Sequence, residues 1–279
     1  MIAHVIGMTA ATAGVILFAL LPFLPGGYDS LAAPLSLMSQ IFGVVGLLLV
    51  PVGVSWLLAE YRSRTARKRY RFAIAALFAG SLVWALVTIG AAVESVALGV
   101  ASLALWIYVV SRVARRVRAM KDTPPPGRSA TPAYLIVVPI AVALIQPALA
   151  GPVTEWSRSR AIRNSEALLA DIERYRAANG RYPLSLVALH SDYKPSIIGI
   201  RQYVYEPNAE AYNLLFETFT FRFGTREIVM YNPRDQHAMT SHAMDRLQLT
   251  PAQLELDQQR GHYALHDAPH PHWKYYWFD

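Results

Sequence analysis

The sequence contains no cysteine, which excludes disulfide bridges, thiol catalysis and thiolate-bound metal ions anywhere in its 279 residues. It also lacks a P-loop pattern and a glycine-rich dinucleotide pattern, two widespread phosphate-binding motifs. No nucleophile, base and acid stand at spacings that indicate catalysis. We therefore assign no catalytic residue and no cofactor, and we favour a non-enzymatic role.

Acidic residues are scarce in the first half of the chain. Residues 1–152 hold four Asp and Glu against twelve Lys and Arg, whereas residues 153–279 hold fifteen against fourteen. The formal net charge of +7 is thus the sum of +8 and −1. The twelve cations form two clusters between apolar segments, which is the pattern of membrane topology. For that reason we expect no nucleic-acid partner.

The chain is too apolar for an ordinary soluble protein, with 54% hydrophobic and 16% charged residues. Five apolar segments account for the excess, and we expect them to cross a bilayer. They cover about residues 2–24, 34–58, 72–92, 96–110 and 133–150. A cleaved signal peptide is the alternative for the first segment, but no basic residue precedes it.

The two basic runs predict the orientation. Tyr61–Arg71 and Arg112–Arg128 each carry six cations, whereas the loops at 26–33 and near Glu94 carry none. Positively charged loops stay in the cytoplasm, so the N-terminus is expected inside and the C-terminal part outside. The sequence thus predicts a multi-pass inner-membrane protein with a periplasmic C-terminal domain. The lipid bilayer is its first partner, and the basic runs can bind anionic lipid.

Ionisable side chains are nearly absent from the spans, whereas transport pathways usually need them. Gln40 is the strongly polar residue of the second span, and Glu94 lies near a turn. We expect residues 1–152 to form a five-helix transmembrane anchor that packs through small residues. A membrane transport component is the alternative.

A different pattern begins at Ala161. Apolar residues recur at three- and four-residue spacings up to Tyr175, which predicts an amphipathic helix. Asn179-Gly180 supplies a left-handed stop, and Pro183 cannot continue a helix.

Alternating residues after Ile200 predict strands. We expect strands over 200–206, from Tyr212 onward with a bulge near 217–219, over 227–231, and over 273–278. Pro207-Asn208 is expected as a turn, and Thr250-Pro251 as the start of a short helix. The fold class is a helical membrane bundle of about five helices, followed by an α+β domain over 153–279. In this domain one long helix packs on an antiparallel sheet of about four strands.

The run LLADIERYRAANGRYPLSLVAL, followed by Tyr203, Tyr205, Tyr212 and Phe216 on strands, resembles the globular part of type IV pilin-like and type II secretion pseudopilin proteins. The resemblance covers about residues 161–231. It implies a long helix that ends in a Gly-x-Tyr-Pro turn and packs on an antiparallel sheet. It implies no catalytic residues, and here the preceding apolar segment is the fifth of five.

Histidines cluster near the end of the chain. His262, His266, His270 and His272 are candidate ligands for a divalent metal, because imidazole suits zinc and related ions. The alternative is a polar loop with titratable surface histidines. A metal-binding sensor or enzyme is therefore the second functional hypothesis.

Aromatic residues supply candidate contacts. Tyr182, Tyr275 and Trp277 are candidates for an interaction surface, although such runs are more often strand core. The leading hypothesis is a non-catalytic interaction or assembly domain in the envelope. It binds an envelope protein or a second copy of itself.

Overall fold

The structure is a computed structural model, and it describes residues 2–62, 66–122, 128–208, 211–223, 225–237 and 263–278. The chain divides into two compact units. The helical unit consists of Met1–Leu21 and Leu31–Ala150, and the C-terminal unit consists of Pro22–Ser30 and Gly151–Asp279. The first loop, expected in the membrane domain, thus belongs to the second unit.

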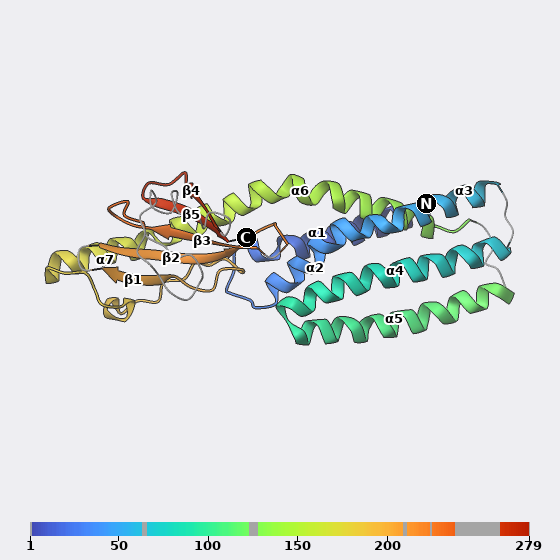
Figure 1. Ribbon diagram of the computed structural model, residues 1–279, viewed down its shortest axis with the longest axis horizontal. Coiled ribbons are helices and arrows are strands. Elements are labelled where there is room, and N and C mark those ends of the chain that lie inside the picture. Colours follow the sequence, from blue (N-terminus) through green and yellow to red (C-terminus); the bar gives the residue numbers. More distant parts are fainter. Residues whose placement is uncertain are drawn as a thin grey trace. The chain divides into compact units, whose positions relative to one another are not determined.

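Long apolar helices build the helical unit (Figure 1). Within the described residues, five helical stretches are long and apolar enough to cross a membrane, which suggests a multi-pass membrane protein. The helices are α1 Ile2–Leu20, α2 Ala32–Val45, α3 Leu49–Arg62, α4 Ala66–Glu94, α5 Val96–Asp122 and α6 Thr131–Asn164, with a 3-10 turn at Leu21–Phe23.

The second and fifth spans differ from expectation. The second is not one helix, because a 3-10 turn at Gly46–Leu48 separates α2 from α3. Pro51 has no amide hydrogen to donate to the carbonyl of Leu47, which interrupts α-helical pairing there. The fifth span was expected to end near 150, but α6 continues to Asn164 without a break. The boundary between the two units therefore falls inside α6.

Side-chain hydrogen bonds join neighbouring helices of the helical unit. Gln146 Nε2 of α6 donates to the carbonyl of Ser39 in α2 at 2.8 Å. Ser36 Oγ of α2 donates to the carbonyl of Ala19 in α1 at 2.6 Å. Trp84 Nε1 of α4 donates to the carbonyl of Ser102 in α5 at 3.1 Å. Such bonds satisfy polar groups between the helices and hold neighbouring helices together.

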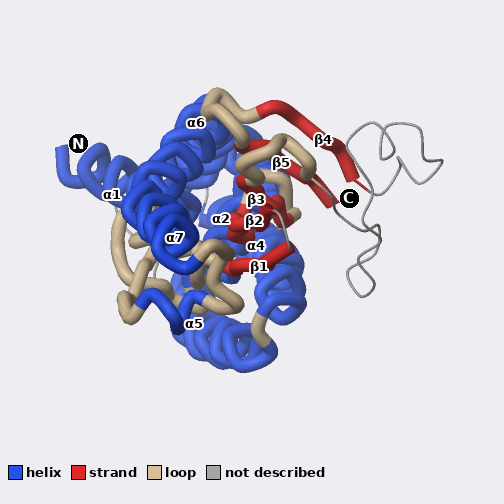
Figure 2. The backbone as a smooth tube through the Cα atoms, turned by 90° about the vertical axis from the view of Figure 1, so that its left-hand side faces the viewer, coloured by secondary structure: helices blue, strands red, loops and turns tan. Residues whose placement is uncertain are grey.

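The C-terminal unit contains an antiparallel sheet with helices along one face (Figure 2). Its five strands lie in the order β1-β2-β3-β5-β4. They are β1 Val204–Asn208, β2 Ala211–Phe219, β3 Arg226–Tyr231, β4 Tyr263–Asp267 and β5 Trp273–Phe278. The helical layer consists of the last part of α6 and of α7 Glu166–Asn179, and a 3-10 turn at Leu186–Leu189 follows.

The core of this unit lies between the helices and the sheet. Leu168 and Ile172 of α7 are fully buried, as are Tyr212, Leu214 and Phe216 of β2. These residues belong to one apolar cluster. The three- to four-residue spacing of the helix and the two-residue alternation of the strand predict it. The sequence-based prediction of a helix packed on an antiparallel sheet therefore describes this unit.

The end of the helix is confirmed, but its start is not. The expected single helix from Ala161 is divided at Ser165, whose Oγ donates to the carbonyl of Ile162 at 2.7 Å. A serine that bonds back to the preceding turn commonly bends a helix. Gly180 adopts φ 73°, and its amide donates to the carbonyl of Arg176 at 2.8 Å, so it is the left-handed stop.

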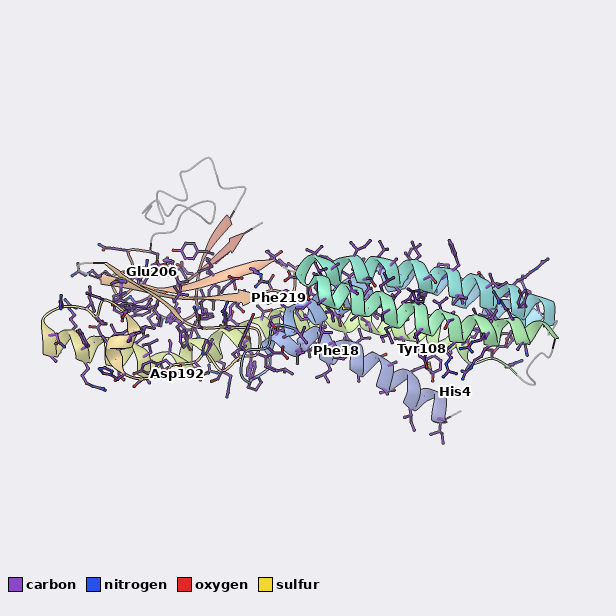
Figure 3. The ribbon with its side chains drawn as sticks, turned by 90° about the horizontal axis from the view of Figure 1, so that it is seen from below. His4, Phe18, Tyr108, Asp192, Glu206 and Phe219 are labelled. Atoms are coloured by element: carbon purple, nitrogen blue, oxygen red, sulfur yellow. The ribbon has the colours of Figure 1, made fainter. Side chains whose placement is uncertain are left out.

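The bulge expected near 217–219 is absent. The β2–β3 register runs without interruption from Leu214↔Tyr231 to Phe219↔Arg226. The apolar phase shift has another cause, because both faces of β2 are covered. Phe216 faces the helices, whereas Phe219 (Figure 3) is 2% exposed and packs against Phe23 on the other side.

The strand boundaries also differ. β1 begins at Val204 rather than 200, and Pro207 and Asn208 lie inside it instead of forming a turn. The sheet has five strands rather than about four, because β4 occupies the segment expected as a histidine-rich loop. The short helix expected after Thr250 lies outside the described residues.

The Gly180→Ala substitution measures the free-energy cost of a side chain at the left-handed residue that ends α7. A Cβ at this position meets no atom within 4 Å, so the penalty is conformational only. We expect a loss of about 1 kcal/mol in unfolding free energy. Thermal unfolding of the full-length protein measures it. Gly151→Ala is the control, since that helical glycine also has open space and its replacement should be neutral or stabilising. Equal effects of the two substitutions would contradict the left-handed conformation at Gly180.

Candidate functional site

The first loop of the chain is part of the C-terminal unit. Pro25 forms an antiparallel bridge with Ile197. The amide of Gly26 donates to the carbonyl of Ser196 at 3.1 Å, and the amide of Ile198 donates to the carbonyl of Leu24 at 2.9 Å. Two segments about 170 residues apart in the sequence are thus joined through their backbones.

Close packing supports this pairing. Phe23 is 1% exposed, and its ring stacks on Phe221 at a centroid distance of 5.4 Å. The amide of Gly199 donates to the carbonyl of Pro22 at 2.8 Å. A Cβ on Gly199 would lie 2.6 Å from that carbonyl oxygen, so only glycine allows this approach without a shift.

A cavity of about 390 Å³ lies beside the docked loop, on the sheet face that points away from α7. Tyr28 of the loop lines it and is 50% exposed. Alternate residues of three strands provide aliphatic surface, namely Val204, Leu215 and Ile228. The polar lining consists of Arg201, Gln202, Glu217 and Arg226.

The lining of this cavity carries more positive than negative charge. Arg226 pairs with Glu217 at 2.8 Å, and both side chains are about half exposed. Arg201 has no carboxylate partner among the described residues, so the lining carries one uncompensated cation. An aromatic ring, guanidinium groups and aliphatic surface together are typical of a protein-binding surface. Sequence reasoning missed Tyr28, which lies in the first loop, and Phe23, which was assigned to the first apolar segment.

A buried ion pair lies on the opposite face of the sheet. Glu227 of β3 is 0% exposed and accepts two hydrogen bonds from Arg158 of α6, at 2.5 Å from Nε and 2.8 Å from Nη2. The Arg158 guanidinium also lies 4.3 Å from the ring centre of Tyr275. No local sequence signal could find this pair, because its members are 69 residues apart.

Burial is the largest influence on the pKa of Glu227. Removal from water raises the pKa of this carboxyl group from 4.5 to about 7, although Arg158 favours the charged form. Glu155 adds to the rise, and Arg222 opposes it. Burial also raises the pKa of Tyr275, so its hydroxyl stays protonated and donates to Glu155 at 3.2 Å.

The predicted histidine ligands do not converge within the described residues. His266 lies on β4 and is exposed. His270 Nε2 lies 3.0 Å from Ser159 Oγ on α6, whereas His272 Nδ1 lies 3.0 Å from Asp235 Oδ2. In the described part of the chain, no three His, Asp or Glu residues form a metal-binding group. His262 lies outside that part.

The aromatic residues expected to contact a partner are placed differently. Tyr182 and Tyr275 are 7% and 4% exposed and belong to the core between helices and sheet. Tyr182 packs on Tyr212 at 5.0 Å between ring centres, and it thus contributes to the core. Trp277 lies on β5, opposite Glu227 in register.

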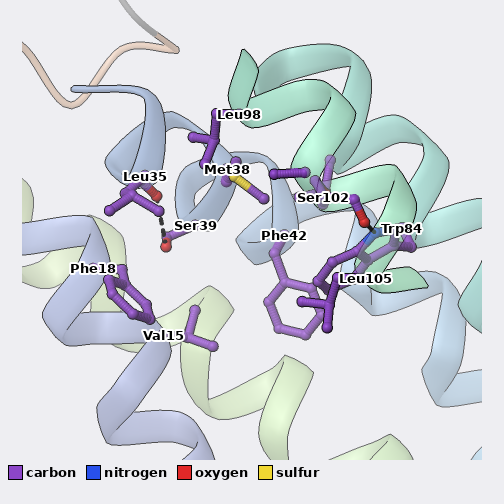
Figure 4. A pocket seen from close by; sticks show the side chains of 12 residues that line it. Val15, Phe18, Leu35, Met38, Ser39, Phe42, Trp84, Leu98, Ser102 and Leu105 are labelled. Atoms are coloured by element: carbon purple, nitrogen blue, oxygen red, sulfur yellow. Dashed lines mark hydrogen bonds between the residues drawn. The ribbon is translucent and has the colours of Figure 1, made fainter. Parts of the chain in front are cut away.

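The helical unit contains an apolar groove of about 440 Å³ (Figure 4). Its two serines are already hydrogen-bonded: Ser39 Oγ donates to the carbonyl of Leu35 at 3.0 Å, and the carbonyl of Ser102 accepts from Trp84. None of the residues that line the groove is ionisable.

Comparison with protein-family models, with curated proteins and with solved structures finds no match for this chain.

The pH dependence of stability tests the environment of Glu227. A carboxyl group whose folded pKa exceeds its unfolded pKa makes the folded state less stable as pH rises between the two values, here from about 4.5 to about 7. The expected contribution is on the order of 3 kcal/mol. Glu227→Gln should remove this part of the pH dependence in unfolding of the full-length protein.

The matched control is Glu217→Gln, because Glu217 belongs to an exposed ion pair on the same sheet. Its pH profile should run parallel to that of the wild type. If Glu227→Gln also runs parallel to the wild type, burial does not raise the pKa of Glu227.

Proposed function

We propose that this protein is an integral inner-membrane protein of a bacterial envelope. Its helical unit anchors a periplasmic, pilin-like domain that binds an envelope protein or a second copy of itself. The observation that supports binding most directly is the mixed cavity beside Tyr28, built from two distant parts of the chain. The proposal includes no catalytic step.

The basic runs determine the proposed orientation, and the docked loop is compatible with it. The basic runs Tyr61–Arg71 and Arg112–Arg128 favour the cytoplasmic side for the loops they occupy. The loop between the first two spans packs inside the C-terminal unit, so these two parts share one side. With five spans, a cytoplasmic N-terminus satisfies both arguments.

The face of the sheet suits a partner better than the β1 edge does. β1 is an edge strand of five residues, and it contains Pro207, which has no amide hydrogen to offer an added strand. The cavity, in contrast, presents the exposed ring of Tyr28 and the guanidinium of Arg201. Tyrosine and arginine contribute strongly to binding energy at protein interfaces.

The features of the helical unit support an anchoring role best. Its groove beside α1 is apolar, and the carbonyls of its two serines accept hydrogen bonds from neighbouring helices, Ser39 from Gln146 and Ser102 from Trp84. A transport pathway needs ionisable or hydrated groups across the membrane. Within the described residues, the helices use their polar side chains for packing instead.

A cysteine pair tests the proposed orientation. Pro25 and Ile197 form a non-hydrogen-bonded antiparallel pair, which places their Cα atoms about 4.5 Å apart. This distance suits a disulfide, and the chain has no other cysteine. The Pro25→Cys/Ile197→Cys variant should form the disulfide in cells, as a mobility shift on non-reducing gels.

A second measurement distinguishes an error in the docking of the loop from an error in the orientation across the membrane. Tyr61→Cys, in the basic run, should react with a membrane-impermeant maleimide only after the cells are opened. If the pair stays reduced in cells but oxidises after purification, the fold is right and the orientation is wrong. If it oxidises in neither setting, the docked loop itself is wrong.

Photo-crosslinking in cells tests the proposed binding surface. A photoreactive residue at Tyr28 should give a protein adduct or a dimer, and Arg201→Glu should abolish it by reversing the uncompensated charge. The control position is Val187, which is 80% exposed and does not line the cavity. If Tyr28 yields no adduct, or if Arg201→Glu leaves its adduct unchanged, the cavity is not the binding surface.

A further inference from the structure

A second cavity of the helical unit has an apolar end and a polar end. Its volume is about 370 Å³, and it lies among α3, α4, α5 and the start of α6. Gly80 of α4 and Trp106 of α5 line the apolar end. Arg116 of α5 lines the other end, together with Ser129 and Thr131 before and at the start of α6.

The sequence positions place the polar end near the basic runs. Arg116 and Ser129 lie within or directly after the run Arg112–Arg128, whereas Gly80 and Trp106 lie one to three helical turns deeper in their spans. The lining therefore changes from hydrocarbon-like to cationic along the direction in which a lipid changes from acyl chain to headgroup.

Arg116 differs from its neighbours in what its guanidinium contacts. Arg69 pairs with the buried Glu60 at 3.3 Å, and Arg128 lies over the ring of Tyr61 at 4.6 Å. Arg115 Nε donates to the carbonyl of Ser111 at 3.2 Å. Arg116 has no carboxylate partner in the described chain, and no acidic residue lines the cavity.

We propose that this cavity binds one anionic phospholipid, with an acyl chain at Gly80 and Trp106 and the phosphate at Arg116. Ser129 Oγ donates to Thr131 Oγ1 at 3.0 Å, which leaves the Thr131 hydroxyl as a further donor to the phosphate oxygens. A cationic pocket between membrane helices on the side of the basic loops suits such a headgroup. The assignment is independent of the function proposed for the C-terminal domain.

Lipid binding to the purified full-length protein tests this site. Delipidated protein in detergent is titrated with phosphatidylglycerol or with phosphatidylcholine of the same acyl chains, and bound lipid is counted by native mass spectrometry. We expect phosphatidylglycerol to bind more tightly. Arg116→Gln should weaken phosphatidylglycerol binding about fivefold and leave phosphatidylcholine unchanged.

The chain offers a control for each end of the cavity. Arg115→Gln removes the adjacent guanidinium, which does not line the cavity, and should leave lipid binding unchanged. Gly80→Leu fills the apolar end, where a Cβ meets only Trp106 at 3.7 Å, and should weaken both lipids. Gly14→Leu, at an open position of α1, should weaken neither.

Two results would overturn the site. The first is equal affinity for the two lipids in the wild-type protein. The second is an equal loss of phosphatidylglycerol binding in Arg115→Gln and Arg116→Gln, because only nonspecific charge attraction predicts it. If Gly80→Leu does not fold, the comparison of the two arginine variants still tests whether the cavity binds the lipid.

Discussion

The backbone pairing between Pro22–Ser30 and residues 196–199 is the constraint on which the arrangement of the chain depends. Because of it, the polypeptide passes between the two units three times: after Leu21, after Ser30 and after Ala150. The pairing also builds the cavity, since Tyr28 reaches the sheet only when the loop is docked.

The ion pair of Arg158 and Glu227 plays a comparable part on the other face of the sheet. Desolvation of two charges is costly, and a buried pair often stabilises a fold less than apolar residues would. Several contacts between α6 and the sheet must fit at once, however. Arg158 makes two hydrogen bonds to Glu227 and lies over the ring of Tyr275, and Glu155 of the same helix accepts from the Tyr275 hydroxyl. We interpret the pair as a device that fixes where α6 lies on the sheet.

Local patterns in the sequence predicted the elements that local physics controls. Apolar length predicted the five spans, and Asn179-Gly180 predicted the helix end, because hydropathy and the freedom of glycine act within a few residues. The phase shift in β2 was misread as a bulge. Its cause is Phe23, almost 200 residues away, which covers the second face of the strand.

The candidate sites show the same difference between features set by neighbouring residues and features set by distant ones. The histidines and aromatic residues that stood out in the sequence are neighbours along the chain, but His270 and His272 turn to different partners and Tyr275 is buried. The residues of the cavity, such as Tyr28 and Arg201, have no distinctive spacing. They become a site only through tertiary pairing, which a pattern within one segment does not encode.

Charge is used differently in the two units, and this difference separates their roles. In the described C-terminal unit, cations meet carboxylates, as in Arg158–Glu227, Arg226–Glu217 and Lys274–Asp267. In the described helical unit only Arg69 does so, and other arginines rest on tyrosine rings or backbone carbonyls. A cation without a carboxylate partner attracts anionic headgroups when it lies beside a bilayer, whereas an exposed ion pair adds at most about 1 kcal/mol to the stability of a fold. Among the described residues, the cations of the helical unit therefore meet few carboxylates of that unit, whereas those of the C-terminal unit often lie beside carboxylates.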